Sequence, residues 1–197
     1  MKGLDILVAG VGGQGTILAS DILAEVGMLA GYDVKKSDVL GLAVRGGSVL
    51  SHVRWGEEVA SPVISPGTAT FLLGFEPLEA LRVISYLSPE STVLVNTRAV
   101  PPVSVSSGNM DYPSLEEIER TLRADCRRFF SFDATAVAEK LGTARVANVV
   151  MLGAFATQVD IPQVIWEDAI SARVPAKYRD LNLRAFHAGR ELLKGGL

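Results

Sequence analysis

Hydrophobic and polar positions follow two periods along this chain, one typical of buried strands and one typical of helices. Residues 4–9 form an almost continuous aliphatic run that ends at Gly10, which is the pattern of a strand buried on both faces of a parallel sheet. Between residues 16 and 29, apolar side chains recur at helical spacing, and Gly31 follows as a stop signal. The beginning of the chain therefore predicts a strand, a glycine-rich turn and a helix.

The same two patterns alternate along the rest of the chain. Further strands are expected at residues 32–39, 49–55, 59–64, 69–75, 92–96 and 128–133, with 49–55 and 59–64 as paired strands. Further helices are expected at residues 76–82, 114–122, 135–141, 148–159, 161–172 and 175–193. The alternation predicts an α/β fold in which residues 1–197 form a single Rossmann-like domain. We expect a mainly parallel sheet with helices on both faces and a helical C-terminus.

Composition and charge exclude several classes of protein. Of the 197 residues, 48% are hydrophobic and 21% are charged, which provides enough apolar material for a core and excludes intrinsic disorder. The net charge is −3 and no basic block occurs, so we expect no nucleic-acid partner. The longest apolar run, residues 146–156, is shorter than the roughly 20 residues of a membrane span. Because the N-terminal stretch shows no secretion signal either, we expect a cytoplasmic protein without membrane contact.

Residues of the types used in catalysis and metal binding are few and scattered. The single cysteine, Cys126, excludes an intrachain disulfide, a thiolate zinc site and an iron–sulfur cluster on this chain, and we expect an inert thiol. The two histidines, His52 and His187, lie far apart in sequence and are expected to be structural or surface residues. Glu76 and Glu79, at the start of a predicted helix, are expected to be partners of the helix dipole. No catalytic residue and no metal ligand is therefore assigned.

A glycine-rich loop carries the strongest local signal. Gly10, Gly12, Gly13, Gln14 and Gly15 belong to a G-x-G-x-x-G pattern placed between a predicted strand and a predicted helix. Glycines let the backbone approach a ligand closely, and the N-terminus of the helix offers unpaired N–H groups to phosphate. We name these five residues as candidate cofactor-binding residues, with phosphate binding and backbone packing as the two favoured roles.

A nicotinamide or flavin cofactor is less favoured at this loop. The dinucleotide fingerprint requires an acidic residue about 20 positions after the loop to hold a ribose. Asp33 and Asp38 are the candidates, and neither closes a clean apolar strand. The glycine pattern by itself therefore does not establish a nucleotide site.

A second cluster, Arg45, Gly46, Gly47 and Ser48, adds a cation to open backbone. An arginine beside two glycines presents a fork of donors that suits a phosphate or a carboxylate. The alternative is a solvent-facing arginine on a loop whose glycines only supply positive φ angles. We name these four residues as further candidate binding residues and leave both readings open.

Five segments together resemble one family, the gamma-type subunits of 2-oxoacid:ferredoxin oxidoreductases. They are LVAGVGGQGTILASDIL near the N-terminus, GLAVRGGSVLSHVRWG, LLGFEPLEALR, VLVNT with Pro101 close behind, and VPAKYRDLNLRAFHAG near the C-terminus. Within the family, FEPLEALR and VNT are most similar to the beta subunits of indolepyruvate oxidoreductase. The resemblance covers nearly the whole chain, with the segments in the family's order.

The resemblance implies an accessory subunit of a larger enzyme. Enzymes of this family oxidatively decarboxylate a 2-oxoacid, transfer the acyl group to coenzyme A and pass electrons to ferredoxin. Thiamine diphosphate and iron–sulfur clusters belong mainly to other chains, so we expect no cofactor bound by this chain alone. The implied partners are the catalytic alpha- and beta-type subunits, and ferredoxin through the complex. The implied role is to pack on the catalytic subunits and to help bind coenzyme A through the two glycine-containing clusters.

One departure from the family pattern concerns residues 40–47. Relatives of the indolepyruvate type often have His-Gly-Met-Ala-Gln-Arg-Gly-Gly where this chain has Leu-Gly-Leu-Ala-Val-Arg-Gly-Gly. Polar contacts at positions 40 and 44 are therefore lost, which leaves the identity of the 2-oxoacid open. Two other functions stay open at this stage, a stand-alone Rossmann-like nucleotide-binding protein and a purely structural subunit.

Overall fold

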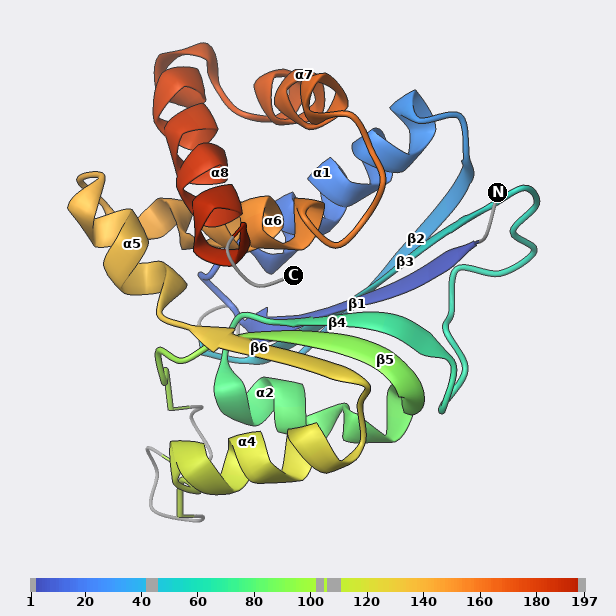
Figure 1. Ribbon diagram of the computed structural model, residues 1–197, viewed down its shortest axis with the longest axis vertical. Coiled ribbons are helices and arrows are strands. Elements are labelled where there is room, and N and C mark those ends of the chain that lie inside the picture. The colour runs from blue at the N-terminus through green and yellow to red at the C-terminus, as the bar shows by residue number, and fades with distance from the viewer. Residues whose placement is uncertain (1–2, 42–45, 102–104, 106–110, 195–197) are drawn as a thin grey trace.

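A six-stranded sheet forms the centre of the molecule (Figure 1). The computed structural model describes residues 3–41, 46–101, 105 and 111–194. The strands, which lie in the order β2-β3-β1-β4-β5-β6, are β1 (Leu4–Val11), β2 (Asp33–Leu40), β3 (Ser48–Gly56), β4 (Ala69–Gly74), β5 (Leu87–Asn96) and β6 (Arg128–Phe132). The pairs β1–β4, β4–β5 and β5–β6 are parallel, whereas β3 runs antiparallel to both β1 and β2. The prediction of a mainly parallel, Rossmann-like α/β fold is confirmed.

Helices cover the two faces of the sheet. They are α1 (Thr16–Leu29), α2 (Pro77–Arg82), α4 (Leu115–Ala124), α5 (Ala134–Lys140), α6 (Ala147–Ala156), α7 (Gln163–Arg173) and α8 (Arg179–Leu193), with the short 3₁₀ turns η1 (Ile84–Tyr86), η2 (Ala144–Val146) and η3 (Ala176–Tyr178). Helices α1, α6, α7 and α8 lie on one face, and α2 and α4 lie on the other (Figure 1). The predicted capping box of α4 is present, with Ser114 and Glu117 bonded reciprocally.

Strand β1 is aliphatic without alternation because both of its faces are buried. Ile6 and Val8 point into the core that includes α1 and α6, whereas Leu7 and Ala9 point into the core against α2 and α4. All four side chains are buried. Each fully buried side chain of the size of valine or leucine stabilises the fold by about 1.5–3 kcal/mol. The continuous apolar run is thus the mark of a strand with a core on both sides.

Helices α6 and α8 pack with their backbones in contact. A Cβ atom added at Gly153 would lie 2.0 Å from the carbonyl oxygen of Phe186, and one added at Gly189 would lie 1.9 Å from that of Val150. No side chain fits at either position without moving a backbone. The two glycines therefore fix the distance between these helices.

The expected strand at residues 59–64 is wrong. Side chains of β3 bind the polar backbone atoms of this segment: Arg54 donates to the carbonyl oxygen of Ser61 at 3.0 Å, and the N–H of Ile64 donates to His52 Nδ1 at 3.2 Å. Because these contacts satisfy its backbone groups, the segment lies against β3 without joining the sheet. Among the described helices, none combines the length and the apolar character that crossing a bilayer requires.

Candidate functional site

The glycine loop, residues 10–15, connects the carboxyl end of β1 to the first turn of α1. Gly13 and Gly15 have φ angles of 106° and 77°, which favour glycine, and Gly15 is the N-cap residue of α1. No side chain caps this helix, so the N–H groups of its first turn are not bound by a capping side chain. The loop therefore has the conformation that the G-x-G-x-x-G pattern predicts.

Gln14 holds the loop closed from within. Its Oε1 accepts from the N–H of Val11 at 2.9 Å, and its Nε2 donates to the carbonyl oxygen of Phe75 at 2.9 Å. A Cβ atom at Gly10 would lie 2.8 Å from the same Oε1, so Gly10 makes room for the Gln14 side chain. Gln14 thus shapes the loop and ties it to the residue that follows β4.

The structure brings the two glycine-containing clusters together. The N–H of Gly12 donates to the carbonyl oxygen of Gly47 at 2.8 Å, and the N–H of Gly46 donates to that of Gly12 at 3.2 Å. Ser48 opens β3 opposite Val11. Arg45 lies outside the described residues. Two segments more than thirty residues apart in sequence therefore form one backbone surface at the carboxyl end of β1.

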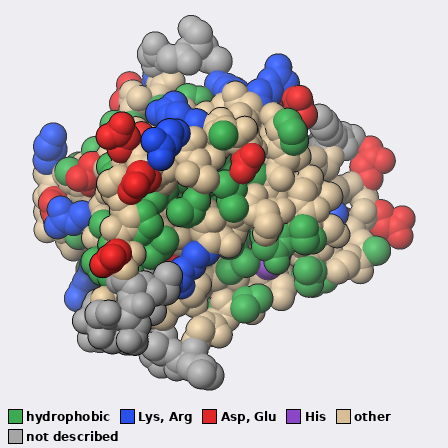
Figure 2. Space-filling model, turned by 90° about the horizontal axis from the view of Figure 1, so that it is seen from below, with side chains coloured by type: hydrophobic (Ala, Val, Ile, Leu, Met, Phe, Trp, Pro, Cys, Tyr) green, Lys and Arg blue, Asp and Glu red, His purple; other side chains and the backbone are tan. Residues whose placement is uncertain are grey.

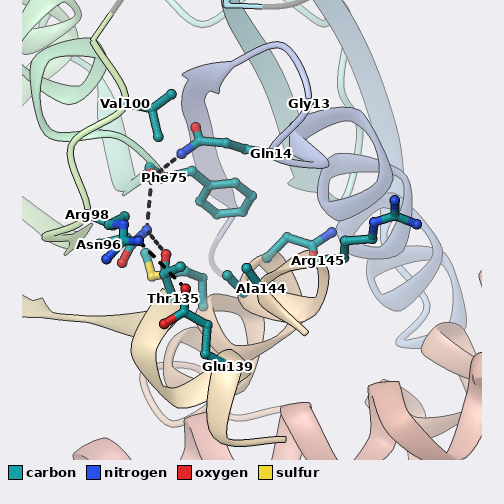
Figure 3. Close-up of a pocket in the computed structure, with 13 residues that line it drawn as sticks. Gly13, Gln14, Phe75, Asn96, Arg98, Val100, Thr135, Glu139, Ala144 and Arg145 are labelled. Carbon is teal, nitrogen blue, oxygen red and sulfur yellow. Dashed lines mark hydrogen bonds and ion pairs between the residues drawn. The ribbon is translucent and has the colours of Figure 1, made fainter. Parts of the chain in front are cut away.

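A polar pocket of about 260 Å³ lies beside this surface (Figure 3). It is lined by Gly13, Gln14, Phe75, Asn96, Arg98, Val100, Thr135, Glu139, Ala144, Arg145, Ala147, Asn148 and Met151. An ion pair of 3.6 Å joins Arg98 Nη2 to Glu139 Oε1, and both side chains are about half exposed. Figure 3 shows Arg98 beside Asn96 and the guanidinium of Arg145 on the opposite side, turned outward. Two arginines and one carboxylate therefore line this pocket, with one of the arginines already paired to the carboxylate.

The carbonyl oxygen of Phe75 joins three elements below the pocket. It accepts from Gln14 Nε2 at 2.9 Å and from Asn96 Nδ2 at 3.1 Å. Asn96, at the end of β5, also donates to Thr135 Oγ1 at 3.0 Å and accepts from the N–H of Ala134 at 3.0 Å. The glycine loop, the end of β5 and the start of α5 are therefore held in one hydrogen-bond network.

Glu76 is a residue of this region whose role the sequence did not reveal. It precedes α2 as its N-cap and is fully buried, and its carboxylate accepts from the N–H of Glu79 at 2.9 Å, the N–H of Val100 at 3.2 Å and the hydroxyl of Tyr112. Its position at a helix start agrees with the predicted dipole role. The long-range partners were not foreseeable, because they lie 24 and 36 residues further along the chain.

An apolar pocket of about 400 Å³ lies on another side of the glycine loop. Among its lining residues, Ile17, Leu40 and Val49 surround the backbone of Gly12 and Gly13. The side chain of Leu40 is 58% exposed and that of Ile17 is 40% exposed. Large apolar side chains left open beside backbone N–H groups are typical of a surface that another molecule covers.

The two candidate ribose-binding carboxylates are engaged elsewhere. Asp33 accepts from Lys35 at 2.6 Å and from the N–H of Val59 at 2.8 Å, and these hydrogen bonds lower its pKa. Asp38 pairs with Lys36 at 2.8 Å and accepts from Ser51 at 2.5 Å. In addition, β3 separates β2 from β1, whereas the dinucleotide fold places the ribose-binding strand beside the first. Both observations agree with the lower rank given to a nicotinamide or flavin cofactor.

The histidines and the cysteine lie away from the loop. Burial lowers the pKa of His52, which accepts a backbone hydrogen bond, and His187 Nε2 lies 3.3 Å from Glu167. Burial raises the pKa of the Cys126 thiol, which disfavours a reactive thiolate. Within the described residues, no group of histidine, cysteine or acidic side chains is arranged to hold a metal ion.

Comparison with known proteins identifies the family. Residues 5–192 match the family model described as pyruvate ferredoxin/flavodoxin oxidoreductase. The chain belongs to this family. It is 39% identical over 197 residues to indolepyruvate oxidoreductase subunit IorB of Thermococcus kodakarensis, a match that covers 98% of each chain.

Solved structures agree with this assignment. The gamma subunit of a keto/oxoacid ferredoxin oxidoreductase from Geobacter sulfurreducens is 25% identical, with a TM-score of 0.69 over 95% of this chain and 96% of that one. A 2-oxoglutarate:ferredoxin oxidoreductase from Magnetococcus marinus, solved with 2-oxoglutarate, coenzyme A and succinyl-CoA bound, shares the fold. It is 20% identical, with a TM-score of 0.74 over all of this chain and 32% of that one. The predicted identity, a gamma-type subunit of a 2-oxoacid:ferredoxin oxidoreductase, is confirmed.

Proposed function

We propose that this subunit packs on the thiamine-diphosphate-bearing subunits of its enzyme and that its two glycine clusters and polar pocket contact coenzyme A. The assembled enzyme then decarboxylates a 2-oxoacid oxidatively to an acyl-CoA and passes electrons to ferredoxin in the cytoplasm. Iron–sulfur clusters are assigned to the other subunits because this chain has one cysteine. Thiamine diphosphate is assigned to them because the family resemblance implies it. This subunit contributes binding surface and no catalytic residue.

One observation carries the coenzyme A proposal. The backbone bonds between Gly12 and residues 46–47 join both clusters into one surface, and the polar pocket with Arg98 and Arg145 borders it at Gly13. Arginine forks and free N–H groups at a helix start are the groups that proteins use for phosphate. Coenzyme A carries phosphate groups, and in open α/β folds ligands lie outside the carboxyl ends of the strands.

Substitution of the cations tests this assignment. In the assembled enzyme, Arg45→Ala and Arg98→Ala should each raise the KM for coenzyme A about tenfold, because each removes a charged donor. The KM for the 2-oxoacid and the co-purification of the subunits should stay unchanged. Arg184→Ala, at an exposed arginine of α8, is the matched control. Native KM values for coenzyme A in both variants would reduce the chain to a purely structural subunit.

The apolar pocket supports the packing proposal. Leu40 and Ile17 are exposed here next to the glycine loop, and burial of such side chains against a second chain is favourable. Leu40→Asp should abolish co-purification with the catalytic subunits while the chain keeps its circular dichroism spectrum. Val164→Asp changes a side chain that is equally exposed, at 58%, on α7 and should co-purify normally. Loss of co-purification in both variants would not support this surface.

The 2-oxoacid is inferred from the relatives. Identity of 39% to a subunit of an indolepyruvate oxidoreductase favours an aromatic 2-oxoacid as the substrate of the assembled enzyme. A comparison of kcat/KM for indolepyruvate, pyruvate and 2-oxoglutarate tests this inference. A preference for either of the two aliphatic acids would show that Leu40 and Val44, which replace polar residues of the family pattern, accompany a change of substrate.

A further inference from the structure

The carboxylate of Glu76 is buried, and its partners among the described residues are hydrogen-bond donors. It is 0% exposed, and within the described part of the chain no lysine, arginine or histidine forms an ion pair with it. Its hydrogen-bond partners come from three segments: the N–H of Glu79 in α2, the N–H of Val100 after β5, and the hydroxyl of Tyr112 before α4. Within the described residues, this carboxylate is therefore stabilised by hydrogen bonds.

Such an arrangement is costly unless every partner stays in place. Removing a carboxylate from water is strongly unfavourable unless well-placed donors replace the lost hydration. Burial, together with the hydrogen bond to Glu76, raises the pKa of Tyr112, so this phenol keeps its proton and donates it to the carboxylate. The carboxylate of Glu76 and its three donors thus form one hydrogen-bonded cluster that holds three segments together.

Capping of α2 does not explain a glutamate at this position. The residues preferred at an N-cap are serine, threonine, aspartate and asparagine, whose side chains are shorter. The additional methylene of Glu76 lets one carboxylate reach the N–H of Glu79 in its own helix and also Val100 and Tyr112. Compared with a shorter capping residue, the glutamate adds the hydrogen bonds to Val100 and Tyr112.

Those contacts fix one wall of the polar pocket. Val100 and Arg98, two residues apart after β5, both line the pocket, and Arg98 extends toward Glu139 on α5. The preceding residue, Phe75, holds the glycine loop and Asn96 through its carbonyl oxygen. We propose that Glu76 is a positioning residue that sets the wall carrying Arg98 and Val100, and thereby the affinity of the pocket for coenzyme A. The second part rests on the function proposed above.

Glu76→Asp separates positioning from capping. Aspartate caps helices well, so the N–H of Glu79 should keep its protection from hydrogen exchange within about twofold. The shorter side chain should lose the hydrogen bond from the N–H of Val100. In the full chain, this N–H should then exchange about tenfold faster, as measured by NMR. In the assembled enzyme, the KM for coenzyme A should rise about fivefold while kcat stays native.

Tyr112→Phe provides a second variant that removes one hydroxyl and leaves α2 intact. It should speed exchange of the Val100 N–H about threefold, and Tyr86→Phe, at a tyrosine of η1, should not. Native exchange at Val100 in both Glu76→Asp and Tyr112→Phe would overturn the positioning role, and Tyr112→Phe decides alone if Glu76→Asp does not fold. Faster exchange with a native KM for coenzyme A would support positioning and count against the coenzyme A proposal instead.

Discussion

At the scale of single residues, Glu76 and Glu79 at the start of α2 are equally buried and differ in their partners. Among the described residues, Glu76 has three donors, whereas Glu79, which is 1% exposed, has Arg82 at 3.2 Å as its charged neighbour. Burial raises the pKa of Glu79, Arg82 offsets part of this shift, and the charge of Glu76 adds to it. The apolar residues Ile118 and Leu122 of α4 pack in the same core. Glu79 is therefore the carboxyl group of this region whose ionisation opposes folding.

The raised pKa of Glu79 predicts how the stability of the fold depends on pH. Because the pKa of Glu79 is raised in the folded state, its contribution to stability is complete below the unfolded pKa and is lost as the pH rises through the folded pKa. Glu79→Gln has no such loss. Its free energy of unfolding relative to the native chain should therefore improve as the pH rises above the ordinary glutamate pKa of 4.5, as measured in urea titrations. Glu116→Gln, at an exposed position of α4, should show no such change, and a constant difference for Glu79→Gln would contradict the prediction.

Local residue patterns could be read from the sequence, whereas contacts between distant segments could not. The five named residues of the glycine loop followed from one motif, because a turn between strand and helix depends on neighbours in the chain. The bond between Gly12 and Gly47 and the partners of Glu76 depend on the order of the strands, which no local pattern encodes. Sequence analysis therefore found both halves of the surface but not their contact.

At the scale of elements, hydrophobic periodicity predicted the strands and helices. The exception is a segment whose backbone atoms bind side chains of a neighbouring strand and not its backbone. Segment 59–64 has a strand-like pattern, yet Arg54 and His52 bind its backbone atoms. The parallel strands β1, β4 and β5 were identified from their aliphatic runs because both of their faces are buried. The remaining parallel strand, β6, is aromatic and half-buried. The insertion of β3 between β1 and β2 was not predicted, since strand order is a property of the whole sheet.

The contact between α6 and α8 gives a prediction at this scale. Gly189→Ala places a Cβ atom 1.9 Å from the carbonyl oxygen of Val150, so the two helices must move apart. We expect the free energy of unfolding to fall by about 3 kcal/mol in urea titrations, at the upper end for an overpacked core. Arg184→Ala, on the exposed side of the same helix, should change it by less than about 0.5 kcal/mol. Similar values for the two variants would show that this contact is not tight.

At the scale of the whole molecule, the chain offers few of the residue types that hold a redox centre. The chain contains one cysteine, and the described residues hold no metal-binding group. Its relative IorB, which it matches over 98% of both chains, is itself named as a subunit. Figure 2 shows hydrophobic side chains gathered on a face beside a region of mixed charge. Apolar side chains that gather in one exposed patch, rather than lying scattered singly, are typical of a surface that another chain covers.

The assignment of the cofactors to the other subunits predicts that the purified chain has no activity of its own. Alone, it should not oxidise pyruvate, 2-oxoglutarate or indolepyruvate with a viologen as the artificial electron acceptor. Electron transfer needs iron–sulfur clusters that one cysteine cannot hold, and the proposed function assigns thiamine diphosphate to the other subunits. Addition of the catalytic subunits should restore viologen reduction that depends on coenzyme A. A preparation of the catalytic subunits with the Leu40→Asp chain should stay as inactive as one without this chain. Turnover by the isolated chain would show instead that it holds a complete catalytic site.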